Sequence, residues 1–490
     1  MPISADLQRA LARNSKLVIL ESKGDASKPD YESASYRRQI GDVLFCRTVY
    51  DGTKAVRDAG DALLPQYPSE DDEDYQRRLK RAVLFNAFKR TAHGLVGMIY
   101  RKDPQWKDTP PERTAVESLN VDLLGHDINV FARDRSIDAM IDGHTWVLVD
   151  YPRVEVQLQS QADEREQGLR PYWVPILKSQ AINVQWEVGP DGRPRLTLFA
   201  YKTVKTDREG AFGEEEKECI RVLEPGGFTE YERTKSGWVE VDQGASTLPY
   251  IPVAFIPSNE TMPYESTPPL LDVAFENIDH YQIRSDHRWA GMFASQPMPV
   301  FTGAEPEQIV WGAGRALFLP NPEANATLLE SSGASLDSTR DDMKDSEARM
   351  AALGLQMLVG EKRTAETAQS KLIGKAESDS VLSAMAKAMQ DGFNRALAIH
   401  ADWTGTEPAE LALNNDFHET QLDSQTVMAL SNLVARGQLS MDTMWSALLA
   451  GEVLPDSFDP EEERERIDAA GMDELEALLA MRGNGNGSDE

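Results

Sequence analysis

An α+β fold is predicted for this chain of 490 residues from three features of its sequence. Residues 144 to 257 alternate apolar and polar side chains in short runs, a pattern typical of half-buried strands. Glycine-containing turns separate these runs, which indicates antiparallel hairpins. Long segments of helical periodicity precede and follow them. Strands gathered in one stretch between helices favour an α+β domain over a parallel, doubly wound sheet.

The first strong helical segment covers residues 69 to 100. Ser69 offers an N-terminal cap, and the acidic residues after it suit the first turn of a helix. Apolar side chains then recur at helical spacing, at Leu84, Phe88, Leu95 and Ile99. This pattern predicts one amphipathic helix whose cations between residues 77 and 81 lie on a solvated face.

Three longer helices are predicted in the second half of the chain. Prolines close both ends of a helix over residues 269 to 296, on which His280 and His287 are expected to be interface histidines. A second helix begins near residue 336 with a narrow apolar seam at seven-residue spacing. A third, rich in alanine and serine, covers about residues 367 to 403. Shorter helices and an acidic tail follow.

The break between the second and third helices lies in the stretch "LVGEKRTAETAQSKL". Gly360 can adopt the left-handed conformation that ends a helix, and Thr364 or Thr367 can cap the next one. Lys362 and Arg363 lie between them in a chain whose formal net charge is -30. The sequence therefore predicts an exposed loop that carries two of the chain's scarce cations.

Composition excludes several classes of protein. Cys46 and Cys219 are far apart and form neither a disulfide framework nor a metal-ligand pattern, so they are expected to be buried thiols in a reducing compartment. Neither a signal peptide nor an apolar run long enough to span a bilayer is present. Residues 401 to 490 hold 20 Asp or Glu against 4 Lys or Arg. Such acidity argues against tight binding of nucleic acid.

Candidate catalytic residues are few. Asp134, Asp138 and Asp142 repeat every four residues and are followed by His144, so three carboxylates could share a helix face as metal ligands. A solvated acidic stripe explains the same spacing. Nucleotide-binding loops, nucleophile elbows and zinc-protease motifs are absent from the sequence. The pattern as a whole favours a protein that is not an enzyme and needs no cofactor.

The order of these segments resembles the portal proteins of tailed bacteriophages. The similar residues are "GEKRTAETA" at 360 to 368 and "LSNLVARGQLSMDTMWSALLAGEVLPDSFDPEEERERI" at 430 to 467, which looks like the helical C-terminal part of a portal. The segment 67 to 104 is also similar to a portal-like family catalogued as a domain of unknown function. The order of these motifs gives the resemblance its specificity.

The resemblance implies a portal-type fold with an antiparallel β/α wing, long stem helices, a small β clip, a tunnel loop and a helical crown. It assigns the segments as wing 1 to 268, stem helices 269 to 296 and 336 to 358, clip 297 to 335, tunnel loop 359 to 366, long wing helix and return strand 367 to 418, crown 419 to 482, and disordered tail 483 to 490. Portal proteins form a ring of about twelve subunits at one vertex of the virion capsid, after synthesis in the cytoplasm of the bacterial host.

The implied partners are other copies of the chain, the large terminase subunit, capsid and scaffolding proteins, a head-tail adaptor, and double-stranded DNA that passes without specific binding. The implied tunnel-loop residues are Gly360, Glu361, Lys362, Arg363 and Thr364. The expected ring-packing residues of the stem are Leu271, Phe275, Ile278, Tyr281, Trp289, Leu336, Met343 and Met350. Two alternatives stay open: a metal-dependent hydrolase built on the three aspartates, and another capsid-associated adaptor.

Overall fold

The structure is a computed structural model that forms two compact units, Met1–Asn415 and Asp416–Glu490. It describes residues 25–107, 112–152, 169–259, 261–294, 298–302, 325–329, 334–356, 381–415, 417, 424–450, 453–455, 458–467 and 469.

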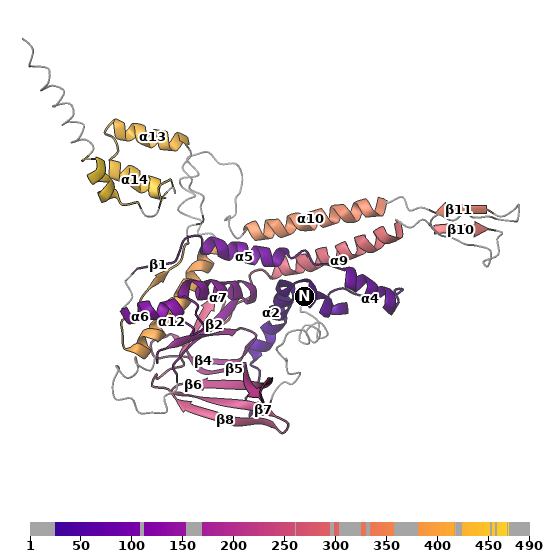
Figure 1. Ribbon diagram of the computed structural model, residues 1–490, viewed down its shortest axis with the longest axis horizontal. Helices are drawn as coiled ribbons and strands as arrows, with labels where there is room; N and C mark the ends of the chain where they lie inside the picture. Colours follow the sequence, from indigo (N-terminus) through magenta and orange to yellow (C-terminus); the bar gives the residue numbers. More distant parts are fainter. Residues whose placement is uncertain are drawn as a thin grey trace, which may run out of the picture. The chain divides into compact units, whose positions relative to one another are not determined.

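The first unit combines helices with antiparallel sheets (Figure 1). Its α-helices are α2 (Ala34–Asp51), α3 (Thr53–Asp58), α4 (Asp72–Arg81), α5 (Ala87–Ile99), α6 (Glu112–Glu117), α7 (Ile128–Asp142), α9 (Leu271–Ala294), α10 (Ala334–Gln356) and α12 (Val381–Thr404). Side-chain oxygens cap the first turns of four of them, from Ser33, Asp71, Asn86 and Asp127. Over the described residues, none of the helices combines the length and apolarity needed to cross a bilayer.

The single helix predicted over residues 69 to 100 is wrong, because the structure has two helices there. Asp71, not Ser69, caps α4, and Ala82 is extended after its last turn. Asn86 then caps α5 by accepting a hydrogen bond from the backbone N–H of Lys89 at 2.8 Å. The periodicity runs through the break because Leu84 within it and Phe88, Leu95 and Ile99 of α5 are all buried.

The hairpins predicted between residues 144 and 257 are confirmed. The strands of this region are β2 (His144–Asp150), β3 (Tyr172–Leu177), β4 (Ala181–Val188), β5 (Pro194–Glu209), β6 (Gly213–Glu224), β7 (Gly227–Thr234), β8 (Gly237–Ala245) and β9 (Val253–Pro257). Strands β4 to β8 form one five-stranded antiparallel sheet in sequence order. Strand β2 lies between β3 and β9 in a second sheet.

Aromatic side chains fill the core between these two sheets. Trp146 on β2 is 1% exposed, and its ring meets Phe199 of β5 edge to face, with ring centroids 5.0 Å apart. Tyr36 of α2 packs with Ile182 and Ile220 in a second buried cluster. Burial of such rings contributes a large share of the hydrophobic free energy of a domain.

Helix α12 lies directly against β9. A Cβ atom placed on Gly392 would lie 2.5 Å from the carbonyl oxygen of Phe255, so only glycine permits this approach of helix to strand. Helix α12 covers the part of the predicted 367 to 403 helix that the structure describes. After it, β12 (Leu411–Ala412) pairs with β1 (Gln105–Trp106).

The second unit is helical where it is described. Helices α13 (Ser424–Ala435) and α14 (Met441–Ala450) pack together through a short turn. Gly437 has a φ of 69° after α13, and the Ser440 hydroxyl accepts a hydrogen bond from the Thr443 N–H at the start of α14. The indole of Trp445 meets the Phe458 ring with centroids 5.8 Å apart. A helical C-terminal part was predicted, and this turn explains its Gly-x-x-Ser pattern.

Candidate functional site

Helices α9 and α10 form a long antiparallel pair, side by side in Figure 1. Polar side chains join them at several levels. A hydrogen bond of 2.7 Å links His287 Nδ1 to Thr339 Oγ1, and His280 Nε2 lies 3.3 Å from Glu347 Oε1. The two histidines predicted for this helix are therefore interface residues. Strands β10 (Met298–Thr302) and β11 (Asn325–Leu329) follow α9 and precede α10, and they pair antiparallel as a hairpin.

The expected ring-packing residues differ in burial. Ile278, Tyr281 and Met350 are buried within the chain itself. Phe275 is 43% exposed, although its ring lies 4.6 Å from that of Phe45 on α2. The remaining four are half-buried, namely Leu271, Trp289, Leu336 and Met343. Ile278, Tyr281 and Met350 are therefore buried without a second copy of the chain. Packing of the eight residues between subunits stays a prediction.

The backbone on both sides of the α4–α5 break anchors α9. Asn277, which is fully buried, donates to the Phe85 carbonyl at 2.7 Å and accepts from the Phe88 N–H at 3.0 Å. One turn further, Gln282 donates to the Leu63 carbonyl at 2.9 Å. The two bonds of Asn277 satisfy backbone groups that the break leaves free of helical partners, and the bond of Gln282 satisfies a carbonyl in the segment before α4. This role of Asn277 was not predicted from the sequence. An asparagine on the apolar face of a long helix could have indicated it.

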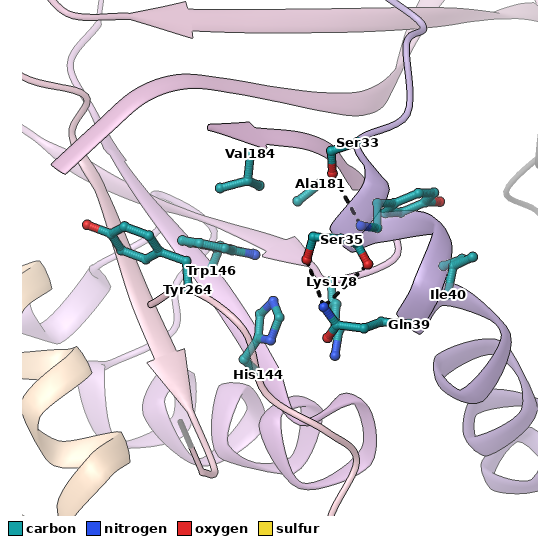
Figure 2. Close-up of a pocket in the computed structure, with 11 residues that line it drawn as sticks. Ser33, Ser35, Gln39, Ile40, His144, Trp146, Lys178, Ala181, Val184 and Tyr264 are labelled. Carbon is teal, nitrogen blue, oxygen red and sulfur yellow. Dashed lines mark hydrogen bonds between the residues drawn. The ribbon is translucent and has the colours of Figure 1, made fainter. Parts of the chain in front are cut away.

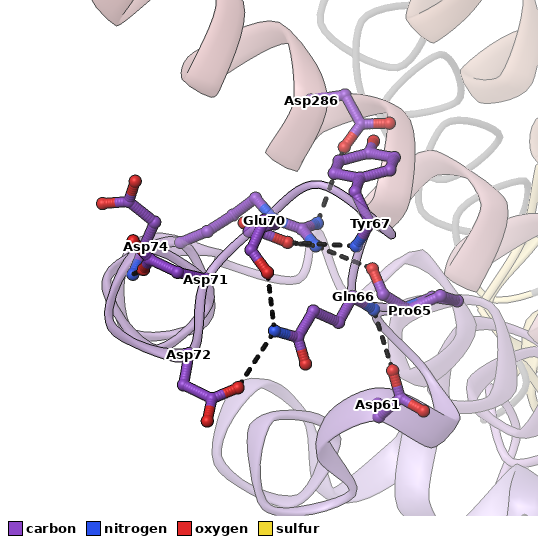
Figure 3. Close-up of polar contacts among 10 residues, drawn as sticks. Asp61, Pro65, Gln66, Tyr67, Glu70, Asp71, Asp72, Asp74 and Asp286 are labelled. Carbon is purple, nitrogen blue, oxygen red and sulfur yellow. Dashed lines mark hydrogen bonds and ion pairs between the residues drawn. The ribbon is translucent and has the colours of Figure 1, made fainter.

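A buried ion pair joins α4 to the segment before it, and its arginine also reaches α9 (Figure 3). Arg78 donates to both carboxylate oxygens of Glu70, at 2.8 and 2.7 Å, and to the Pro65 carbonyl at 2.7 Å. Its guanidinium lies 4.7 Å from the centroid of the Tyr67 ring and 3.7 Å from Asp286 of α9. The side chains of Arg78 and Glu70 are 2% and 5% exposed. The sequence interpretation placed Arg78 on a solvated face, which is wrong.

The aspartates of the proposed metal site bind an arginine instead. Arg47 of α2 donates to Asp138 at 2.7 Å and to both carboxylate oxygens of Asp142 at 2.7 Å. Burial by itself lowers the pKa of the Arg47 guanidinium. The charges and hydrogen bonds of Asp142 and Asp138 have a larger effect, so the pKa is raised overall. Asp134 is exposed, and over the described residues it forms no ion pair with Arg47. Among the described residues no cluster of three or more possible ligands could hold a metal ion, so the hydrolase alternative loses its ligand set.

A small cavity lies between α2 and the three-stranded sheet (Figure 2). Its polar wall includes His144, which is hydrogen-bonded to Ser266 at 2.9 Å, and Lys178, which donates to the carbonyls of Asp142 and Ser266 at 3.1 and 2.6 Å. The cavity volume is about 30 Å³. This is room for about two water molecules and not for an organic substrate. The cavity therefore gives no support for an enzyme.

Replacing Lys178 with methionine should change how stability depends on pH. Burial lowers the pKa of Lys178 from 10.5 to about 8. Between these values the unfolded chain binds a proton at this site that the folded chain lacks. The lysine therefore stabilises the fold most at high pH, and this stability is lost as the pH falls to about 8.

The measurement is urea unfolding of both proteins across this pH range. The advantage of the wild type over Lys178→Met should grow by up to about 3 kcal/mol as the pH rises through it. An unchanged difference would show that Lys178 keeps its ordinary pKa in the folded chain.

The predicted tunnel loop lies outside the described residues. This applies to Gly360, Glu361, Lys362, Arg363 and Thr364, so their role stays a prediction. The centre of the predicted clip, residues 303 to 324, also lies outside them.

Comparison with known proteins gives a partial family match. Residues 269 to 404, from α9 to the end of α12, match a family described as a domain of unknown function, DUF4055. The segment 67 to 104, which carries part of the portal resemblance, lies outside this match. No curated protein matches the sequence significantly.

Three solved structures are similar at 12% identity. The virion of a native gene transfer agent particle has a TM-score of 0.38, over 72% of this chain and 86% of that chain. The neck of the empty particle, computed with C6 symmetry, has a TM-score of 0.40, and the match covers 77% of this chain and 92% of that chain. The neck of the native particle, computed with C12 symmetry, has a TM-score of 0.39, and the match covers 74% of this chain and 89% of that chain. Likeness of this degree carries no conclusion about what this chain does.

Proposed function

We propose that this chain is a portal-type subunit, which forms a ring around a channel at one capsid vertex. The observation that carries the proposal is the α9–α10 pair, rooted in the α+β body at one end and connected through the β10–β11 hairpin at the other. This arrangement has the order of stem helix, clip and stem helix that the portal resemblance implies. A pair of helices of this length also presents a long surface to neighbouring subunits.

In this proposal the segments carry distinct tasks. The helix pair forms the wall of the stem, the hairpin forms the clip that packs with neighbouring clips and docks the terminase, and residues 359 to 366 form the tunnel loop. Helix α12 supports that loop, and the second unit forms the crown. Capsid and scaffolding proteins hold the ring, and a head-tail adaptor replaces the motor after packaging.

The charge of the chain suits a conduit for DNA. A net charge of -30 on each subunit is repeated around the ring, so phosphates are repelled and the duplex does not adhere to the wall. Strong binding would stall movement. Lys362 and Arg363 then act as a local ring of cations that touches the duplex without gripping it.

Replacing Lys362 and Arg363 with alanine should leave ring assembly and thermal stability nearly unchanged. The same double variant should alter the amount of DNA that capsids take up or keep, because the loop loses its contacts with phosphate. The measurement is the DNA content of capsids that carry the variant. Wild-type filling and retention would remove the loop from the DNA path.

The test of the proposed function is the location of the chain in assembled particles. Gold-labelled antibody against the chain should mark one vertex per capsid when the chain is produced together with its capsid proteins. Label over all vertices would indicate a coat or decoration protein, and capsids without label would contradict a portal role.

A further inference from the structure

Four arginines from three helices gather around the short segment between α4 and α5. Arg288 donates to the Arg81 carbonyl at 3.1 Å, and Arg284 donates to the Val83 carbonyl at 3.4 Å. The Arg81 guanidinium lies 2.9 Å from the sulfur of Met292, one turn beyond Arg288. Arg90 stacks over the Phe85 ring at 5.2 Å from its centroid. We call Arg81, Arg90, Arg284 and Arg288 the arginine cluster.

The arginine cluster has no carboxylate partner in the described part of the chain. Three of its members are exposed and Arg284 is half-buried, whereas Arg77 and Arg78 nearby are each paired with acids. Like charges held close together raise the free energy of the fold unless an anion meets them. Backbone carbonyls occupy one nitrogen of Arg284 and of Arg288, which leaves other N–H donors of each guanidinium for an acceptor outside the chain.

The outer face of α10 carries the opposite charge. Asp341, Asp342 and Asp345 are exposed on this helix, whereas the buried Ser346 and Met350 face α9. Asp341 is paired with Lys344 at 3.0 Å. Asp342 and Asp345 form no ion pair over the described residues. Asp345 is also attracted to Arg349, which is itself paired with Glu276 of α9. Two exposed carboxylates without an ion pair of their own therefore lie on the surface of α10.

The two charged surfaces lie at the same height along the helix pair. His287 bonds Thr339 and His280 lies beside Glu347, so the antiparallel register puts Asp342 level with Arg284. A cyclic symmetry operation rotates a subunit about the ring axis and does not move it along that axis. When the helix pair runs along the axis, Asp342 and Asp345 of one copy are thus presented at the level of Arg284 of the next.

We propose that the arginine cluster of one subunit binds the Asp342 and Asp345 carboxylates of its neighbour, and that this contact closes the stem ring. The inference rests on the proposed ring. A second copy fits the cluster better than DNA does, because the complementary acids lie on the same chain at the matching height.

The test uses charge reversal on each side of the contact in the full chain. Arg284→Glu with Arg288→Glu should place acids against acids, and Asp342→Arg with Asp345→Arg should place cations against cations. Each double variant should weaken ring formation at least ~10-fold, measured as the protein concentration at which half the chains are assembled. A chain with all four changes restores opposite charges and should recover most of that loss. Lys54→Glu with Lys235→Glu, two exposed sites elsewhere, is the matched control and should assemble as wild type does.

The outcomes separate the contact from the ring itself. Rings from every variant at wild-type concentration, or a fourfold variant no better than the double variants, would overturn the contact while the proposed function stands. Normal assembly of the arginine variant together with weaker binding to a short DNA duplex would assign the cluster to DNA instead. A wild-type chain that stays monomeric at all concentrations would overturn both. Circular dichroism of each variant checks that its fold is retained.

Discussion

Replacing Arg47 with methionine should lower the free energy of unfolding by about 3–5 kcal/mol. The guanidinium bridges α2 and α7 through Asp138 and Asp142, which are 7% and 0% exposed. Methionine fills much of the same volume but leaves the fully buried Asp142 without its cation, and Asp138 with Arg135 alone at 3.0 Å. An uncompensated buried charge costs more than the pair contributes when intact. Urea unfolding followed by tryptophan fluorescence measures the loss, since Trp146 and Trp173 lie in the same body.

The control for this prediction removes the charges together with the arginine. Arg47→Met combined with Asp138→Asn and Asp142→Asn leaves no buried carboxylate to neutralise, so it should regain at least half of the lost stability. A combined variant as unstable as Arg47→Met alone would mean that the packing of the arginine, and not its charge, holds α2 to α7.

Replacing Arg78 with methionine should cost a similar amount, about 3–5 kcal/mol. The change leaves Glu70 buried without a cation, frees the Pro65 carbonyl, and removes the cation from between Tyr67 and Asp286. Helix α4 should therefore loosen from α9, and hydrogen exchange should rise over residues 63 to 81. Arg77→Met is the matched control. Its pairs with Glu73 and Asp74 are largely exposed, so about 0.5 kcal/mol or less is expected.

Acid should reduce the effect of Arg78→Met. The hydrogen bonds from Arg78 lower the pKa of Glu70, against the opposing effect of burial. A carboxylate with a lowered folded-state pKa stabilises the fold above its ordinary pKa of 4.5, and this stability is lost as the pH falls through the folded-state value. The difference between wild type and variant should shrink below about pH 4.5. A constant difference down to pH 3 would show that the ion pair is not its source.

Local patterns in the sequence were sufficient for the antiparallel hairpins and for each of the two helices α9 and α10. Strands β4 to β8 are joined by tight turns, so each pairs with the strand next to it in sequence. The burial of Cys46 and Cys219 as free thiols was also predicted and is confirmed. The hairpins and helices are determined by residues that lie close together in the sequence. The burial of the cysteines follows from the low polarity of their side chains.

Long-range polar pairing could not be predicted from the sequence. Arg47 is 95 residues from Asp142, and Asn277 is 192 residues from Phe85. Spacing alone gave Asp138 and Asp142 the appearance of a ligand set, because it cannot show which cation the fold brings to them. The α4–α5 break has the same origin, since the backbone of residues 83 to 88 takes its partners from α9.

The mass of the full-length chain in solution tests the ring most directly. Single-particle mass photometry over a range of concentrations should show one species about twelve times the 54.5 kDa of the chain, or another closed multiple of it. The reversal variants of the stem should move this species toward the monomer. A single peak at 54.5 kDa at every concentration, with no rings in electron micrographs of the same sample, would contradict a portal-type subunit.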